Sequence, residues 1–163
     1  MSADLLFPVA PTPTIAVVGE SRRFPVNRIF CVGRNYADHA KEMGVEVDRE
    51  APFYFLKHAG AIVPTGATVA YPPGTENYHY EMEFVVAIGA PAFRVPVETA
   101  MDAVLGYACG LDMTRRDLQL WCKDNALPWE IGKDVEQSGP VGAVVPASKM
   151  GHPTSGEIGR AHV

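Results

Sequence analysis

A chain of 163 residues, of which 47% are apolar and 20% charged, is long enough to form one globular domain with its own core. The net charge of −5 and the pI of about 5.5 argue against nucleic-acid or anionic-lipid partners, and no apolar run approaches the roughly 20 residues that span a bilayer. Three distant cysteines without CxxC spacing favour free thiols in a cytoplasmic protein over disulfides or a zinc site.

The expected elements are mostly short strands. Residues 1–24 are rich in proline and predict an extended lead-in with one short strand. Further on, the pattern predicts strands in RIFCVG, FYFLK, AIVPTG, YEMEFVVAIG and GPVGAVVPAS. Helices are expected in NYADHAKEMG and MTRRDLQLWCKDN, and VETAMDAVLGYACGL starts as a helix and continues as a strand. This order predicts an α+β fold dominated by strands.

The strand that begins in NYHYEMEF carries His79, Glu81 and Glu83 at alternate positions, which share one face of a strand. Two carboxylates on one face repel, and a divalent cation that binds oxygen ligands (Mg²⁺, Mn²⁺ or Ca²⁺) would resolve the conflict. A solvated strand face is the usual explanation of such a pattern. The apolar run FVVAIG that follows favours partial burial, and Asp112, at the end of another strand, is a candidate third ligand.

Three further segments carry ionisable side chains in suggestive surroundings. His39 and Glu42 share one face of the expected helix, where the carboxylate would orient the imidazole as a general base; a surface pair is the alternative. Lys133 lies in an irregular stretch, where it could hold an anion or simply face solvent. A helix would turn neighbouring arginines apart by about 100°, so at most one of Arg115 and Arg116 is expected to face a site.

Four segments resemble the fumarylacetoacetate hydrolase family in order and spacing: RIFCVGRNYADHAKEMG, NYHYEMEFVVAIG, GYACGLDMTRRDLQ and PWEIGK. The resemblance covers roughly residues 24–146 and is nearest to the branch that cleaves acylpyruvates such as fumarylpyruvate. It implies a mixed β-sheet roll with few short helices.

The resemblance also implies functions for single residues. It identifies Glu81, Glu83 and Asp112 as metal ligands for Mg²⁺ or Mn²⁺, and His39 with Glu42 as the catalytic pair. It implies that Lys133 is the active-site lysine and that Arg116 lies near the substrate, whereas His79 supports the site or the fold. Cys31, within a strand, is interpreted as a core residue.

The implied reaction is hydrolysis of the C–C bond of an acylpyruvate, a small β-diketo acid, to pyruvate and a second acid in aromatic-compound catabolism. His39 would take a proton from water, and Lys133 would stabilise the developing oxyanion. Two alternatives remain: an isomerase or decarboxylase acting on oxaloacetate or a 2-hydroxy-dienedioate, and a copy without catalytic activity. Family members are generally dimers, so a homodimer is expected for the full-length protein.

The sequence also departs from the family pattern. The family reads Gly-Lys-any-Phe-Asp where this chain has Gly132 to Glu136, and Lys-Pro where it has Lys57 and His58. The last seven residues, EIGRAHV, are what one frame of a common sequencing adapter encodes. We therefore expect a lead-in at 1–24, a partial catalytic domain at 25–156 and a non-native tail at 157–163, with the C-terminal part of the family domain missing and an apolar face left exposed.

Overall fold

The computed structural model describes residues 4–33 and 52–156, together with the backbone of residues 160–162. Its strands are β1 (Thr14–Ile15), β2 (Phe24–Pro25), β3 (Ile29–Gly33), β4 (Phe53–Lys57), β5 (Ile62–Pro64), β6 (Tyr78–Ile88), β7 (Val104–Leu111), β8 (Thr114–Arg115), β9 (Gly139–Val141), β10 (Val145–Pro146) and β11 (Arg160–His162). Its helices are short: the α-helices α2 (Arg116–Asp124), α3 (Glu130–Lys133) and α4 (Ala147–Met150), and the 3₁₀ helices η1 (Ala59–Ala61) and η2 (Val97–Ala103).

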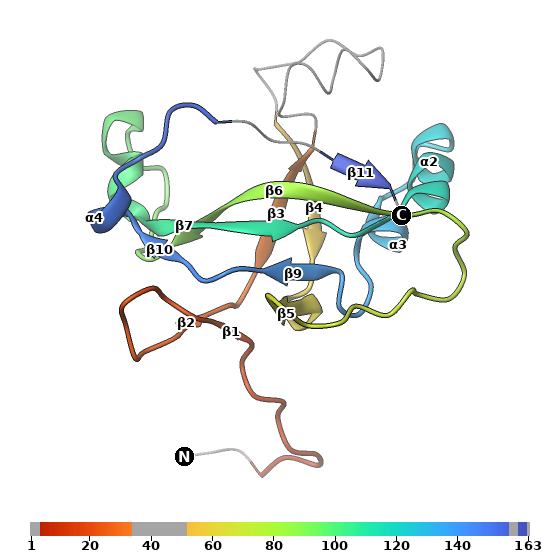
Figure 1. Ribbon diagram of the computed structural model, residues 1–163, viewed down its shortest axis with the longest axis horizontal. Coiled ribbons are helices and arrows are strands. Elements are labelled where there is room, and N and C mark those ends of the chain that lie inside the picture. Colours follow the sequence, from red (N-terminus) through yellow and green to blue (C-terminus); the bar gives the residue numbers. More distant parts are fainter. Residues whose placement is uncertain (1–3, 34–51, 157–159, 163) are drawn as a thin grey trace.

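A central sheet runs in the order β11-β6-β7-β9-β5, with β8 paired to β6 and β10 paired to β7 (Figure 1). The β6–β7 pair is antiparallel and places Glu83 opposite Gly110, whereas β5 and β9 run parallel. β1 and β2, and likewise β3 and β4, form separate antiparallel pairs. This mixed sheet with few short helices confirms the predicted α+β architecture.

Two clusters of buried apolar side chains lie on different sides of the fold. The first joins the N-terminal strands to the central sheet through Ile15, Val26, Ala87, Ala108, Val141 and Val144. The second lies between β4 and α2–α3 and contains Phe55, Cys122 and Trp129. The Phe53 ring extends this second cluster, with its centroid 4.7 Å from that of Trp129.

One helix boundary differs from the expectation. The segment MTRRDLQLWCKDN was predicted to be helical throughout, but α2 begins only at Arg116. Thr114 and Arg115 instead pair with His79 and Tyr78 as strand β8. Pairing with β6 therefore overrides local helix propensity here. In the part of the chain that the structure describes, no helix has the length and apolar character needed to cross a membrane.

Candidate active site

Two carboxylates lie together where β6 passes the end of β7. Glu81 belongs to β6, and Asp112 directly follows β7 and donates its backbone N–H to the carbonyl oxygen of Glu81 at 2.8 Å. Both residues are buried, with 8% and 6% of their surfaces exposed. Burying two carboxylates is costly unless cations or hydrogen-bond donors compensate them.

Lys133 supplies the central compensation. Its Nζ lies 2.6 Å from Glu81 Oε2, 2.6 Å from Asp112 Oδ2 and 2.8 Å from Thr114 Oγ1. Burial lowers the pKa of Lys133 from its ordinary value, and the adjacent Asp112 carboxylate acts in the opposite direction. The structure thus brings together three of the predicted site residues, from β6, the end of β7 and α3.

Gly132 allows α3 to carry Lys133 to this position. A Cβ at Gly132 would lie only 2.7 Å from the backbone nitrogen of Gln119 in α2. The two short helices therefore pack more closely than any other residue at position 132 would permit. This contact gives a physical reason for glycine immediately before the site lysine.

Arg116 lies on the other side of Glu81. Its guanidinium Nη2 contacts Glu81 Oε1, and its Nη1 donates to Gln119 Oε1 at 2.9 Å. Arg115 points elsewhere and donates to the backbone carbonyls of Pro73 and Ile131. Of the two neighbouring arginines, Arg116 is thus the one that contacts the buried carboxylates.

Lys57 is a site residue that the sequence analysis did not select. Only 4% of its surface is exposed, and its Nζ lies 3.0 Å from Asp112 Oδ1. The same ammonium donates to Ser138 Oγ at 3.0 Å, to the Met113 carbonyl at 3.2 Å and to the Lys133 carbonyl. In FYFLK, Lys57 follows Phe53 and Phe55 at alternate positions, so the three side chains share one face of the strand. A lysine on the apolar, inward face of a strand is the sequence feature that could have identified it.

Cys31 in β3 lies near these charges. Burial raises the pKa of its thiol to about 12, and the negative charge of Asp112 adds to the shift while Lys57 and Lys133 oppose it. Glu83 contributes in the same direction as Asp112, which places its carboxylate within electrostatic reach of the thiol. Cys31 packs against the second apolar cluster, as expected of a core residue, and it also borders the charged cluster.

The remaining predicted residues are not placed in this cluster. His79 is half-buried, and its Nε2 lies 2.7 Å from Asn77 Oδ1. His39 and Glu42 fall outside the described residues. Among the side chains that the structure describes, no three His, Cys, Asp or Glu residues form a group that could hold a metal ion. The ligand set of Glu81, Glu83 and Asp112 therefore stays a prediction.

The donor atoms nevertheless suit a hard divalent cation. The Lys133 ammonium is surrounded by oxygen atoms from Glu81, Asp112 and Thr114, the kind of ligand that Mg²⁺ and Mn²⁺ prefer. Asp112 Oδ1 is buried and accepts no hydrogen bond among the described residues, although it forms the ion pair with Lys57. The cation that faces this oxygen in the structure is the Lys57 ammonium, at 3.0 Å.

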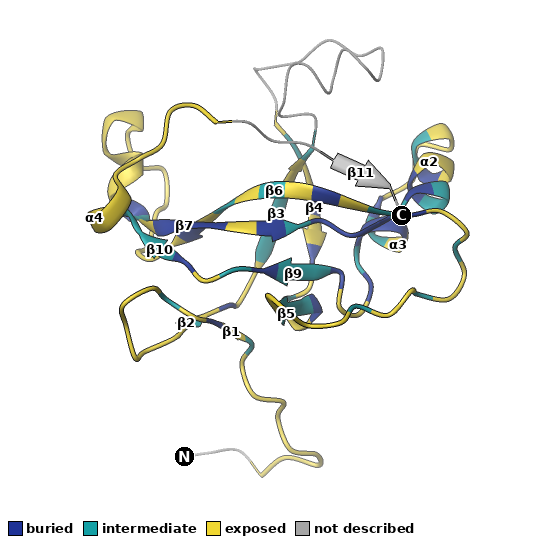
Figure 2. Cartoon of the chain, in the orientation of Figure 1, coloured by how far each residue is buried: buried dark blue, intermediate teal, exposed yellow. Residues whose placement is uncertain are grey.

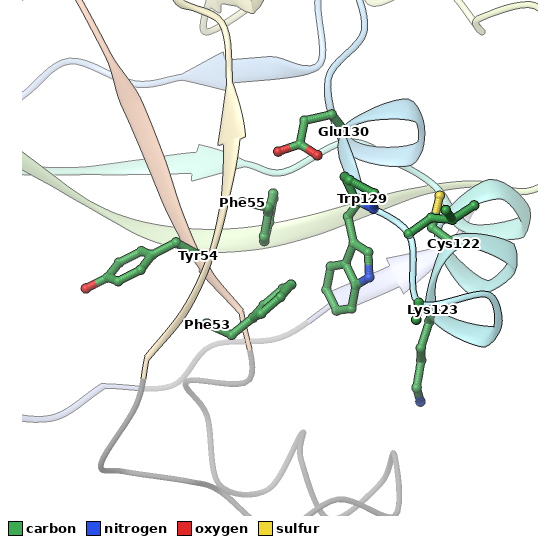
Figure 3. Close-up of a pocket in the computed structure, with 10 residues that line it drawn as sticks. Phe53, Tyr54, Phe55, Cys122, Lys123, Trp129 and Glu130 are labelled. Atoms are coloured by element: carbon green, nitrogen blue, oxygen red, sulfur yellow. The ribbon is translucent and has the colours of Figure 1, made fainter.

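A cavity of about 480 Å³ lies beside the second apolar cluster, between β4 and the segment that joins α2 to α3 (Figure 3). Its walls are mostly aromatic and apolar, and Phe53, Phe55 and Trp129 turn toward it. Phe55 connects the cavity to the charged cluster, since Lys133 Nζ lies 4.9 Å from the centroid of its ring. Phe55 is thus the residue that the cavity and the charged cluster have in common, since Lys133 and the two carboxylates do not themselves line the cavity.

A family profile described as "Fumarylacetoacetate (FAA) hydrolase C-terminal" matches residues 28–160. A fumarylpyruvate hydrolase from Ralstonia sp is 55% identical over 106 residues, which cover 64% of this chain and 55% of that protein. The mitochondrial oxaloacetate tautomerase FAHD1 of Rattus norvegicus is 48% identical over 125 residues, which cover 77% of this chain and 56% of that protein. The chain thus spans about half the length of these curated relatives.

A solved structure is also similar. The crystal structure of fumarylpyruvate hydrolase from Pseudomonas aeruginosa, in complex with Mn²⁺ and pyruvate, superimposes with a TM-score of 0.88 at 46% identity. The match covers 98% of this chain and 74% of that one.

Proposed function

The chain belongs to the fumarylacetoacetate hydrolase family, and we propose that the protein encoded by its full reading frame hydrolyses the C–C bond of an acylpyruvate, with fumarylpyruvate as the first candidate. Since one fold supports many reactions, the site rather than the fold has to support this proposal. The observation that carries it is the buried contact of Lys133 Nζ with both Glu81 and Asp112, each at 2.6 Å.

The charges suit an acidic substrate. Lys57, Lys133 and Arg116 bring three cationic groups to two buried carboxylates, Glu81 and Asp112. We propose that Glu81, Asp112 and Glu83 hold Mg²⁺ or Mn²⁺, as the presence of Mn²⁺ in the Pseudomonas structure suggests. When bound, the cation would act as a Lewis acid toward the keto acid.

The chain's own residues would then divide the remaining tasks. Arg116, which contacts Glu81 Oε1, would orient the substrate carboxylate. His39, with Glu42, would take a proton from water as its oxygen bonds to the distal carbonyl carbon. The C–C bond would then break, with its electron pair remaining on the pyruvate carbon, which later takes up a proton. Lys133 would donate hydrogen bonds to the anionic oxygen.

We propose that the acyl half of the substrate extends past Phe55, whose ring centroid lies 4.9 Å from Lys133 Nζ, toward the cavity that this ring lines. Its aromatic walls suit a flat, unsaturated group such as the fumaryl chain. With this substrate the products would be fumarate and pyruvate, which would place the protein in aromatic-compound catabolism. A cytoplasmic homodimer remains part of the proposal.

The test measures turnover by the protein encoded by the full reading frame. Fumarylpyruvate is supplied with Mn²⁺ or Mg²⁺, and loss of its ultraviolet band is followed together with release of pyruvate. Lys133→Met is expected to lower kcat by about 100- to 1000-fold, whereas the exposed Lys149→Met should leave it unchanged. Absence of pyruvate release, or full activity of Lys133→Met, would contradict the proposal.

The same protein preparation should also be tested for a second function, because an oxaloacetate tautomerase is 48% identical over 77% of the chain. Oxaloacetate is supplied in place of the acylpyruvate, and the rate of keto–enol exchange is compared with that of pyruvate release. Exchange without pyruvate would indicate a tautomerase, and pyruvate release with loss of carbon dioxide would indicate a decarboxylase. Metal binding without either reaction would indicate a copy without catalytic activity.

A further inference from the structure

Two consecutive residues at the end of β4 contact two consecutive residues at the end of α3. Lys57 Nζ donates to the backbone carbonyl of Lys133. Directly after it, His58 Nδ1 lies 2.6 Å from Asp134 Oδ1, and the backbone N–H of His58 is 3.1 Å from both Asp134 oxygens. The strand end and the helix end are thus joined at two adjacent positions.

Asp134 is the point through which this junction reaches the site lysine. It follows Lys133, the last residue of α3, and its backbone N–H donates to the Glu130 carbonyl at 2.7 Å. Any contact that fixes Asp134 therefore also fixes the end of α3 and the direction in which Lys133 leaves it. A shift of the helix end would lengthen the 2.6 Å contacts of Lys133 with Glu81 and Asp112.

We propose that His58 and Asp134 act as positioning residues that hold Lys133 in register with the two carboxylates. The proposal rests on the function proposed for the site. The His58 and Asp134 side chains are 51% and 21% exposed, so the pair lies at the surface and outside both apolar clusters. Removing it should loosen one helix end without opening the core.

The backbone conformation at His58 allows one substitution to remove both of its contacts with Asp134. Its φ of −73° and ψ of 149° are values that proline adopts, and the preceding Lys57 is in an extended strand, as a residue before proline requires. His58→Pro therefore removes the imidazole and the N–H donor together at a backbone conformation that proline adopts, and its ring displaces the Asp134 carboxylate, whose oxygens lie 3.1 Å from the His58 nitrogen. His58→Ala removes only the imidazole, and Asp134→Ala removes the acceptor from the other side.

The experiment uses the protein from the full reading frame, with Asp102→Asn as an exposed control in η2. We expect His58→Pro and Asp134→Ala each to lower kcat by about 3- to 10-fold, with KM and Mn²⁺ affinity changed by less than about 2-fold. His58→Ala should have a smaller effect, because its N–H still donates to Asp134. The double variant should be no worse than either single variant, since both delete the same junction.

Hydrogen exchange provides a readout that does not depend on turnover. The amides of Asp134 and Ser138, which donate to Glu130 and Val135, should exchange about 5-fold faster or more in His58→Pro and Asp134→Ala. The melting temperature and the exchange of the β6 amides should stay unchanged, as in Asp102→Asn.

The outcomes separate this inference from the proposed function. If the wild-type protein does not turn over acylpyruvates, the proposed function fails and hydrogen exchange alone decides whether the pair holds the helix end. Unchanged exchange at residues 134–138, additive losses in the double variant, or a general loss of stability would overturn the inference. Unchanged kcat with faster exchange would also overturn it, because the pair would then hold the helix end without positioning Lys133 for reaction.

Discussion

The two faces of β6 differ in the side chains that they carry and in how far these side chains are buried. The odd-numbered side chains include Glu81 and Glu83, and Glu81 is buried in ion pairs with Arg116 and Lys133. From Tyr80 onward, the even-numbered side chains are apolar or aromatic and are between 38% and 53% exposed: Tyr80, Met82, Phe84, Val86 and Ile88. Tyr78, at the start of the strand, is buried. Figure 2 shows the resulting alternation of burial along this strand.

We call the odd-numbered face of β6 its inner face and the even-numbered face its outer face. Usually one face of an antiparallel sheet packs on an apolar core and the other carries polar groups. The inner face follows this pattern at Ala87, which belongs to the first apolar cluster, and departs from it at Glu81.

Charges are buried on the inner face because Lys57, Lys133 and Arg116 compensate them. The outer face continues onto β7 at Leu105, which is 39% exposed, and at the exposed Cys109. The exposed apolar face agrees with the expectation from the sequence. Stability on the inner face therefore depends on particular charge partners, whereas the outer face lacks them.

The largest effect should come from removing the central cation of the inner face. In Lys133→Met, Glu81 and Asp112 lose a partner that lies 2.6 Å from each, and two buried carboxylates are left to repel each other. We expect a loss of about 3–5 kcal/mol in the free energy of unfolding at pH 7. Urea unfolding of the protein from the full reading frame measures this loss.

Added Mn²⁺ should recover part of the stability of Lys133→Met, because a divalent cation can take the place of the ammonium between the carboxylates. Lys149→Met, at an exposed position in α4, should change stability by less than about 0.5 kcal/mol. A loss of similar size in both variants, or no recovery with Mn²⁺, would break the distinction between the two faces.

The sequence predicted the part of the site that depends on local patterns. Alternation on one strand placed Glu81 on a buried face, and Asp112 was expected at a strand end, where the structure has it. The side chains of the two neighbouring arginines were expected to point in different directions, and only Arg116 contacts the buried carboxylates. Lys57 was missed because its partners are distant in sequence, and no local pattern tells which strand end lies beside which helix end. The predicted start of α2 was wrong for the same reason, because the residues before Arg116 form β8 and pair with the distant strand β6.

A second change acts on the outer face. The double variant Met82→Lys and Val86→Lys replaces two side chains that are 42% and 45% exposed, so little burial is lost. We expect a change in stability within about 1 kcal/mol per site and a clear fall in self-association of the 163-residue chain. Light scattering and binding of a hydrophobic dye measure this fall.

The matched control replaces Leu6 and Phe7, which are 88% and 75% exposed in the N-terminal lead-in, with lysine. These residues do not belong to the face on β6, so association should persist. If both double variants reduce association equally, general charge rather than the outer face is responsible.

The reactivity of the three thiols should differ in the same way, because Cys109 lies on the exposed side of the sheet and Cys31 lies near the buried charges. Cys109 is exposed opposite Phe84, whereas Cys31 borders the charged cluster and burial raises its pKa to about 12. Since the thiolate is the reactive form, iodoacetamide at pH 8 should modify Cys109 more than about 100-fold faster than Cys31. Burial also raises the pKa of Cys122, which should react slowly as well. Peptide mass spectrometry measures each rate, and comparable rates at Cys31 and Cys109 would contradict the burial of charge and thiol together.

The smallest effect concerns a carboxylate that belongs to neither face. Asp117, in the first turn of α2, accepts hydrogen bonds from Thr75 Oγ1 at 2.6 Å, from the Glu76 N–H at 3.0 Å and from the Leu118 N–H at 2.9 Å. Burial alone would raise its pKa, but these hydrogen bonds outweigh burial and lower it. Unlike Glu81 and Asp112, this carboxylate is stabilised by neutral donors at a helix N-terminus.

The sign of the pH dependence follows from that lowered pKa. The carboxylate form binds its donors in the folded state, so its contribution is complete above the ordinary pKa of an aspartate and is lost as the pH falls through the folded value. Asp117→Asn should therefore cost about 1 kcal/mol at pH 7, and the unfolding free energies of the two proteins should converge as the pH falls below the ordinary aspartate pKa of about 3.9. A gap independent of pH would show that Asp117 acts through the shape of its side chain, and that the ionised form of a carboxylate matters only on the inner face of β6.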